Sequence, residues 1–272
     1  MPRIYRETFD HGPGGWWGFA GNHLGLQPLA WRRGTVTTRS PWWIDYNHAP
    51  PGAGYLHMLA CLNVRGPFSD HHREVAGRNT FAEDAYPLDF QDACLRVRVR
   101  GEVRLRGAQL VLLVQGRQGA LISGWLLTGQ PLAVTPRWSE QDITLTPDPA
   151  QWTCLGSRHD RADYYGRLPL ATILRDVNVN LMFVLFPLTV TPMGPLRGDP
   201  HRLRAGRDYP VWTSDLPEGY VELDTVEIAF RGDAPPPARA GQQNDPPSWA
   251  TSGGSKSGVP TGIRTPVLTV KG

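Results

Sequence analysis

The segment at residues 219–230, GYVELDTVEIAF, constrains the fold most, because its alternation of apolar and polar residues changes phase partway along. Its apolar residues occupy odd positions as far as Leu223 and even positions from Val226, although strand side chains alternate strictly between two faces. One extra residue near Thr225, a β-bulge, would restore a single apolar face. It would also place three acids on the opposite face: Glu222, Asp224 and Glu227. Such a row indicates either a carboxylate site or the solvated face of a closing strand.

Several further segments read as strands, and Gly, Pro, Asn and Asp separate them. With the closing strand at 220–230 they are residues 4–9, 35–39, 55–62, 93–100, 109–115, 120–128, 141–145 and 179–186. Only residues 169–177 read as a helix, with Pro at its start and an apolar stripe along one side. The pattern predicts an all-β fold, an antiparallel β-sandwich with one short connector helix.

Composition sets the expected domain organisation. A chain of 272 residues with 40% apolar residues can bury a substantial core, so we expect one sandwich domain over residues 1–231. From residue 232 the chain is rich in Pro, Gly, Ser and Thr, which predicts a disordered tail over residues 232–272. The end of this tail resembles read-through translated from a neighbouring non-coding gene, and we hypothesise that it is not functional.

Charge and hydropathy narrow the expected partners. The net charge of +3 comes without long runs of like charge, which argues against nucleic-acid binding. One set of arginines alternates along a strand, where it would form a solvated face or bind an acidic polymer: Arg96, Arg98, Arg100, Arg104 and Arg106. We expect no membrane association and a cytoplasmic location, because no apolar stretch suits a bilayer span or a leader. Three widely spaced cysteines predict buried free thiols rather than disulfides or zinc.

The two ends of the predicted domain carry a family resemblance. Residues 5–17, YRETFDHGPGGWW, resemble the opening of jelly-roll carbohydrate-binding modules and concanavalin A-like domains, and residues 220–228 resemble their closing strand. The resemblance implies a jelly-roll sandwich whose partner is an oligosaccharide or polysaccharide. In such modules acids near the paired termini can hold a structural calcium ion, and the matching residues here are Glu7, Asp10 and Asp224. Carboxylate oxygens suit calcium.

The closing strand carries a second resemblance. Residues 222–227, ELDTVE, are similar to the Glu-Ile-Asp-x-x-Glu strand of laminarinase-type glycoside hydrolases. That similarity implies Glu222 as nucleophile, Glu227 as acid/base and Asp224 as the residue that positions them. Retaining hydrolysis needs two carboxyl groups about 5 Å apart. Here, however, the predicted domain ends soon after the strand and Thr225 replaces the usual apolar residue. We therefore favour a structural closing strand and keep catalysis as the alternative.

A loop rich in aromatic and polar residues is the main binding candidate. Sugars stack their C–H faces on aromatic rings and hydrogen-bond through their hydroxyls, which suits the segment 40–55. Its candidate residues are Trp42, Trp43, Asp45, Tyr46, Asn47 and His48, in a groove that Gln115, Arg158 and His159 would extend. The alternative is that one tryptophan plugs the core while the polar residues cap a turn.

Two histidine-rich segments, residues 70–74 and 157–161, contain residue types that suit a polysaccharide lyase. His159 could act as the base while an arginine neutralises a uronic carboxylate. The simpler interpretation is that both segments are exposed loops. Carbohydrate recognition is the function we favour from the sequence. The alternatives are a glycoside hydrolase or polysaccharide lyase on the same scaffold, and a structural or subunit-interface sandwich without a glycan ligand.

Overall fold

The computed structural model of the protein describes residues 4–21, 25–45, 55–156, 166–189, 191–198, 209–212 and 215–231. All of them belong to the first of two units into which the chain divides, Met1–Pro235. The predicted tail at 232–272 lies outside the described residues, so its disorder stays a prediction.

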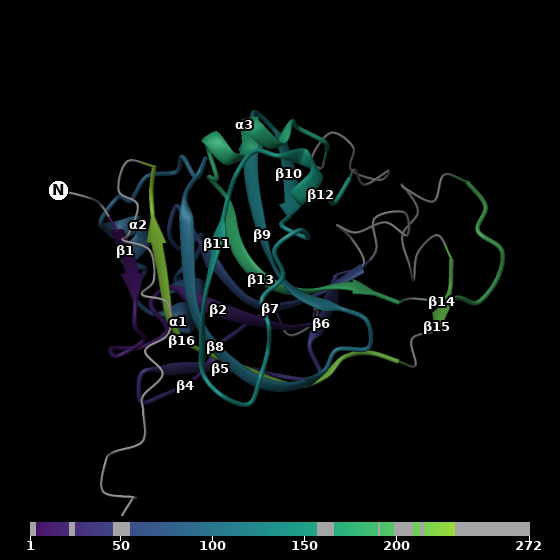
Figure 1. The fold of residues 1–272 in the computed structure, drawn as a ribbon, viewed down its shortest axis with the longest axis horizontal. Helices are drawn as coiled ribbons and strands as arrows, with labels where there is room; N and C mark the ends of the chain where they lie inside the picture. The colour runs from purple at the N-terminus through teal and green to yellow at the C-terminus, as the bar shows by residue number, and fades with distance from the viewer. Residues whose placement is uncertain are drawn as a thin grey trace, which may run out of the picture. The chain divides into compact units, whose positions relative to one another are not determined.

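Two antiparallel sheets form a sandwich, which confirms the predicted fold class (Figure 1). The six-stranded sheet has the order β11 (Ser139–Thr144), β8 (Cys94–Arg104), β16 (Glu218–Ala229), β5 (Thr35–Arg39) and β4 (Ala30–Arg32), with β1 (Ile4–Glu7) also pairing with β16. The eight-stranded sheet has the order β12 (Thr153–Cys154), β10 (Leu121–Leu126), β9 (Gln109–Gln118), β13 (Asn180–Leu188), β7 (Tyr55–Asn63), β2 (Trp16–Gly21) and β3 (Gly25–Gln27), with β6 (Trp43–Asp45) also pairing with β7. A separate pair joins β14 (Thr191–Pro192) to β15 (Val211–Trp212).

The core lies between the inner faces of the two sheets. Trp16 of β2 is fully buried and stacks on Phe183 of β13, with ring centroids 5.5 Å apart. Tyr5 of β1 meets Phe81 edge-on at 5.0 Å. Burying each such side chain contributes about 1.5–3 kcal/mol, so the aromatic residues anchor both sheets to one core.

The predicted β-bulge is present in β16. Leu223 lies opposite Val99 of β8 and Thr225 lies opposite Arg98, so Asp224 is the extra residue. On either side of the bulge the apolar residues are buried and the three acids point outward, as the phase change indicated. The bulge therefore lets one strand of the six-stranded sheet keep a single buried face along its whole length.

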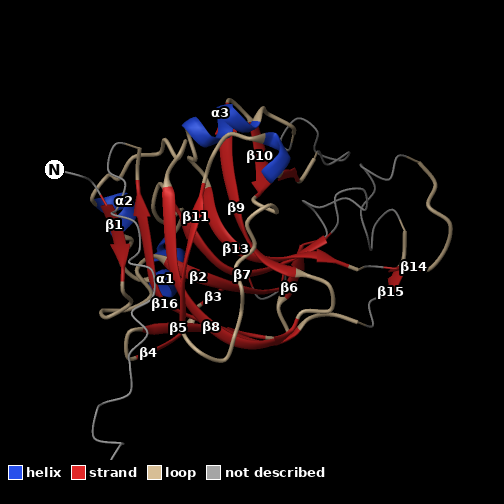
Figure 2. Cartoon of the chain, viewed as in Figure 1, coloured by secondary structure: helices blue, strands red, loops and turns tan. Residues whose placement is uncertain are grey.

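Helices are few and short, and lie beside the sheets (Figure 2). The predicted connector is confirmed as α3 (Leu170–Arg175), which buries Leu170, Ile173 and Leu174. Two more helices, α1 (Asp70–Ala76) and α2 (Thr80–Glu83), and the 3-10 turn η1 (Pro149–Gln151), were not predicted. The expectation of a loop at 70–74 is thus wrong. There Ser69 caps α1 by accepting a hydrogen bond from the His72 amide.

All three cysteines are free; Cys61 is buried, whereas Cys94 and Cys154 are half-buried. Within the described part of the chain, no helix combines the length and apolar character that crossing a membrane requires.

Candidate functional site

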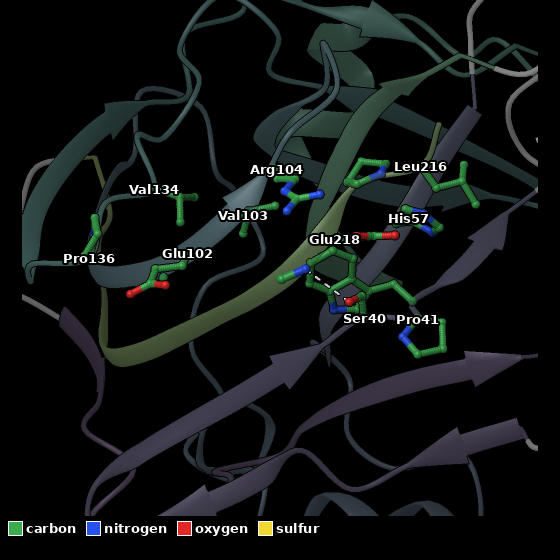
Figure 3. A pocket seen from close by; sticks show the side chains of 14 residues that line it. Ser40, Pro41, His57, Glu102, Val103, Arg104, Val134, Pro136, Leu216 and Glu218 are labelled. Carbon is green, nitrogen blue, oxygen red and sulfur yellow. Dashed lines mark hydrogen bonds between the residues drawn. The ribbon is translucent and has the colours of Figure 1, made fainter. Parts of the chain in front are cut away.

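A hollow of about 880 Å³ opens between the two sheets, beyond the end of β5 (Figure 3). We call it the end cavity. One wall consists of Trp42 and His57, and the other consists of residues 101–104 of β8 and 216–219 at the start of β16. Val134 and Pro136 add apolar surface from the loop before β11. Segments distant in sequence therefore form one concave, mixed polar and apolar site.

Two hydrogen bonds between Ser40, which directly follows β5, and Gly219 of β16 explain why Trp42 lies at this cavity. The Ser40 amide donates to the Gly219 carbonyl at 2.9 Å, and the Gly219 amide donates to Ser40 Oγ at 3.1 Å. Gly219 has a φ of +139°, and a Cβ there would lie 1.9 Å from the Glu102 carbonyl oxygen. Only glycine permits this close approach of β8 and β16, which holds the segment 40–42 against the cavity.

Trp42 is anchored and forms a wall of the cavity. Its indole Nε1 donates to Thr38 Oγ1 at 2.8 Å, and the side chain is only 6% exposed. Trp42 is therefore the tryptophan of the pair that is buried against the core. Because the hydrogen bond fixes the ring, the indole offers a preformed apolar surface to a molecule in the cavity.

His57 supplies a buried hydrogen-bond acceptor. Its Nδ1 lies 3.1 Å from the Trp43 carbonyl oxygen, which can only accept, so Nδ1 carries the proton. Burial lowers the pKa of His57 and so favours the neutral ring, in which Nε2 is an unprotonated acceptor. His57 itself is 2% exposed and lines the cavity. A hydroxyl or amine group of a ligand could donate to this nitrogen.

Three charged side chains line the cavity. Arg104 and Glu218 are directly opposed in the register of β8 and β16, and Glu102 lies two residues before Arg104 on β8. None of the three side chains has an ion pair or a hydrogen bond with the described residues. Figure 3 shows Arg104, Glu218 and His57 together around the hollow. Their hydrogen-bonding capacity is therefore available to a ligand.

The predicted row of acids lies elsewhere, on the outer face of the six-stranded sheet, where each acid meets an arginine. Glu222 accepts from Arg100 Nε at 2.5 Å, and Asp224 accepts from Arg98. Glu227 lies 3.8 Å from Arg6. The structure thus brings the three acids onto one face but engages each with a different guanidinium group. Their hydrolase roles stay a prediction.

Three arginines of the predicted row are neutralised by the same interleaving: Arg96, Arg98 and Arg100. Arg96 forms a two-pronged ion pair with Asp142, at 2.7 and 3.0 Å. The guanidinium groups of Arg98 and Arg100 lie over the Trp138 ring, 5.1 and 4.5 Å from its centroid. The polar placement predicted for this row is confirmed, whereas the charge that would attract an acidic polymer is already matched at Arg96, Arg98 and Arg100.

The three residues proposed for calcium do not converge. Glu7 faces the interior, where its carboxylate accepts from the Phe9 amide at 2.8 Å, and burial raises its pKa. Asp10 accepts from Thr8 Oγ1, while Asp224 lies on the outer face of the sheet. Among the described residues no group of three His, Cys, Asp or Glu side chains could hold a metal ion. No calcium site is therefore proposed for this part of the chain.

The other predicted binding residues are dispersed. Trp43 is half-buried and packs against Phe19 with ring centroids 4.4 Å apart. Gln115 is buried in an amide ladder, where Asn180 donates to it at 2.9 Å and Asn63 donates to Asn180 at 2.7 Å. The side chain of Asp45 and the whole of Tyr46, Asn47, His48, Arg158 and His159 lie outside the described residues. Of the predicted binding residues with a described side chain, only Trp42 lines the end cavity.

Sequence reasoning missed three residues that line the cavity with Trp42, namely His57, Glu102 and Glu218, and it singled out Arg104 only as part of the arginine row. His57 lies in an apolar strand segment, and a histidine in such a run carries no sign of facing a cavity. A weak signal existed in the glycines at 101 and 219, which interrupt two strands. Such interruptions mark a close backbone approach or an opening in a sheet.

Comparisons with known proteins add little to this geometry. No protein-family model and no curated protein sequence matches the chain. Among solved structures, the L4b domain of human laminin alpha-2 aligns with 85% of this chain and 100% of its own, at 9% identity and a TM-score of 0.36. Because that score is below 0.5, the sandwich assignment rests on the two sheets themselves.

Proposed function

We propose that the protein recognises carbohydrate and that the end cavity holds a terminal sugar or a short oligosaccharide. The observation that carries this proposal is the convergence of the Trp42 ring, the His57 acceptor and the charged side chains of Arg104 and Glu218 on one hollow. Its volume of about 880 Å³ lies within the usual range for small-molecule sites.

The chemistry of these groups suits a sugar better than a purely apolar ligand. A pyranose has C–H groups on its faces, which pack on an indole, and hydroxyls around its edge, which donate and accept hydrogen bonds. His57 Nε2 and the Glu218 carboxylate can accept from hydroxyls, and the Arg104 guanidinium can donate to them. Hydrogen bonds to charged groups contribute about 1.5–3 kcal/mol each, so a few such contacts give specificity.

The test is a binding screen against neutral and acidic oligosaccharides, comparing the wild-type chain with Glu218→Gln and Arg104→Gln. Both side chains are exposed and have no ion pair with the described residues, so the substitutions should leave folding intact. We expect each to weaken binding by about tenfold or more, from the loss of a charged hydrogen bond. Glu74→Gln on α1 is the matched control, because that side chain is 77% exposed and away from the cavity, and it should leave affinity unchanged.

Two results would count against this proposal: no binding to any oligosaccharide, or binding that both cavity substitutions leave intact. The same incubations are assayed for reducing-end and unsaturated products. Product release that Glu222→Gln abolishes would instead support the hydrolase interpretation of the outer row. If no oligosaccharide binds and no product is released, the structural or subunit-interface alternative is favoured.

A further inference from the structure

A second hollow lies on the outer face of the six-stranded sheet and carries an excess of positive charge. We call it the outer groove. It has a volume of about 650 Å³; Arg100, Glu222 and Asp224 lie on one side, and the hairpin of β4 and β5 forms the other. Three arginines of that hairpin line the groove: Arg32, Arg33 and Arg39. All three are exposed.

These three arginines differ from Arg98 and Arg100 of β8 in having no carboxylate partner among the residues that the structure describes. Arg100 is paired with Glu222 and Arg98 with Asp224, so the acids of the groove are already matched. No ion pair joins Arg32, Arg33 or Arg39 to any other residue that the structure describes. Arg39 lies over the Tyr220 ring at 4.8 Å, which orients its guanidinium without neutralising it. Within the described part of the chain, the groove therefore presents three cations that no carboxylate neutralises.

The local fold sets the placement of these cations. Residues 33 and 34 form the two-residue hairpin turn, with φ values of 50° for Arg33 and 74° for Gly34. A turn with both central φ values positive suits the twist of a tight hairpin, and glycine adopts it without strain. Beside the turn, Trp31 is 46% exposed and its Nε1 donates to the Phe9 carbonyl. The hairpin is thus anchored and gives the groove an exposed aromatic residue.

We propose that the outer groove binds an acidic polysaccharide chain, with carboxylate or sulfate groups on Arg32, Arg33 and Arg39. Arg33 lies in the turn before β5 and Arg39 at the end of that strand, about 15–20 Å apart at roughly 3.3 Å per residue. Only an oligomer bridges that distance. Sugar hydroxyls can also bond Thr37 and the carboxylate of Glu222, both of which line the groove. The residues are distinct from those of the end cavity, so this inference does not depend on the proposed function.

A nucleic acid fits the groove less well. One strand of a duplex carries a phosphate about every 3.4 Å, so the same length would bring about five phosphates against three cations. Several of those phosphates would face the carboxylates of Glu222 and Asp224. A polyuronate carries one carboxylate per sugar and presents hydroxyls between its charges, and these hydroxyls can bond the acceptors that line the groove beside its arginines.

The experiment uses the full chain and two matched pairs of probes: polygalacturonate with its methyl ester, and dextran sulfate with dextran. The acidic member of at least one pair should bind at 50 mM salt, lose affinity at 500 mM salt, and bind more tightly than its neutral counterpart. Replacing Arg33 and Arg39 together by Gln should weaken that binding at least tenfold. Arg73→Gln combined with Arg65→Gln removes the same charge elsewhere and should change affinity less than twofold.

Four outcomes would overturn this inference. In the first three, no acidic probe binds, the control pair weakens binding as much as the groove pair, or a single-stranded oligonucleotide binds through Arg33 and Arg39 more tightly than either acidic polymer. The cavity variant Arg104→Gln separates the two sites, because Arg104 is the cation that lines the end cavity. Binding of acidic polymer that this variant leaves unchanged supports a distinct outer site, whereas loss in Arg104→Gln with retention in the groove pair assigns the polymer to the end cavity and is the fourth overturning outcome.

Discussion

At the scale of single residues, the end cavity depends on groups whose hydrogen bonds fix them before any ligand arrives. Trp42 is held by Thr38, and His57 is held by the Trp43 carbonyl. His57 is the more consequential of the two, because its burial lowers its pKa and leaves a neutral acceptor in a mainly apolar wall. Because the pKa of His57 is lower in the folded protein than in the unfolded chain, the free energy of unfolding depends on pH.

We predict that acidification below about pH 6.5 destabilises the protein partly through His57. Its folded pKa is lower than the unfolded value of 6.5, so the unfolded chain binds the proton first and stability falls as pH decreases from that value toward the folded pKa. One proton gives at most about 1.4 kcal/mol per pH unit. Urea unfolding at pH 7.5 and 5.5 should therefore show a smaller pH dependence in His57→Gln.

The control for this experiment is His11→Gln, because His11 is exposed. It should retain the wild-type pH dependence. If His57→Gln also retains that dependence in full, the assignment to His57 is wrong.

At the scale of elements, β16 decides how the six-stranded sheet is built. It pairs with β8 along most of its length, with β5 before the bulge and with β1 after it. Asp224 is the inserted residue that keeps Leu223 and Val226 on the same buried face. The bulge therefore determines which face of the whole strand is buried. The Asp224 side chain contributes only a partly exposed ion pair with Arg98.

Deleting Asp224 should be far more damaging than replacing it. The deletion removes the phase change and turns Val226 and Ile228 outward, at about 1.5–3 kcal/mol for each buried side chain lost. Asp224→Ala removes only the ion pair and should cost about 1 kcal/mol or less. The comparison is made by urea unfolding; equal stabilities for the two variants would show that the bulge does not set the register.

At the scale of the whole molecule, the described residues form both sheets of the sandwich and the core between them. The buried aromatic and aliphatic residues run from Tyr5 to Phe230, and both candidate sites lie within the same span. Three large apolar side chains are exposed among the described residues, Trp31, Phe68 and Met193, and they come from separate segments.

We therefore expect a chain ending at Arg231 to keep its stability and its binding. Its melting temperature should lie within about 2 °C of the full chain, because a change of 1 kcal/mol would shift the midpoint by about 2–4 °C in a domain of this size. Thermal unfolding and the oligosaccharide screen on both chains provide the measurement. A larger loss of stability, or of binding, would mean that residues beyond 231 contribute to the folded protein.

Much of the fold could be read from local patterns. Each predicted strand overlaps a strand of the structure, and the bulge was visible as a change of parity in residues 219–230. The missed strands are mostly short, such as β4 and β6, and β2 has glycines that interrupt its alternation. Helix α1 was missed because two turns give little periodicity, although Ser69 followed by Asp70 is a helix-start signal.

The candidate sites show what local patterns cannot supply. Trp42 was identified because tryptophan beside polar residues suggests a sugar site, but its partners come from β7, β8 and β16. Of the arginines predicted to attract an acidic polymer, Arg96, Arg98 and Arg100 are paired on β8, whereas three others on the β4 and β5 hairpin have no ion pair with the described residues. Pairing is a property of two strands, so neither strand alone reveals which charges remain free.

By itself the sequence determined the β-sandwich and the two faces of its strands, because alternation with a period of two is a local property of extended chain. Only the tertiary structure decided which polar groups meet. Residues as far apart as Ser40 and Gly219 become neighbours through strand pairing and a glycine approach. Burial then determines which ionisation state each buried group adopts, as it does for His57.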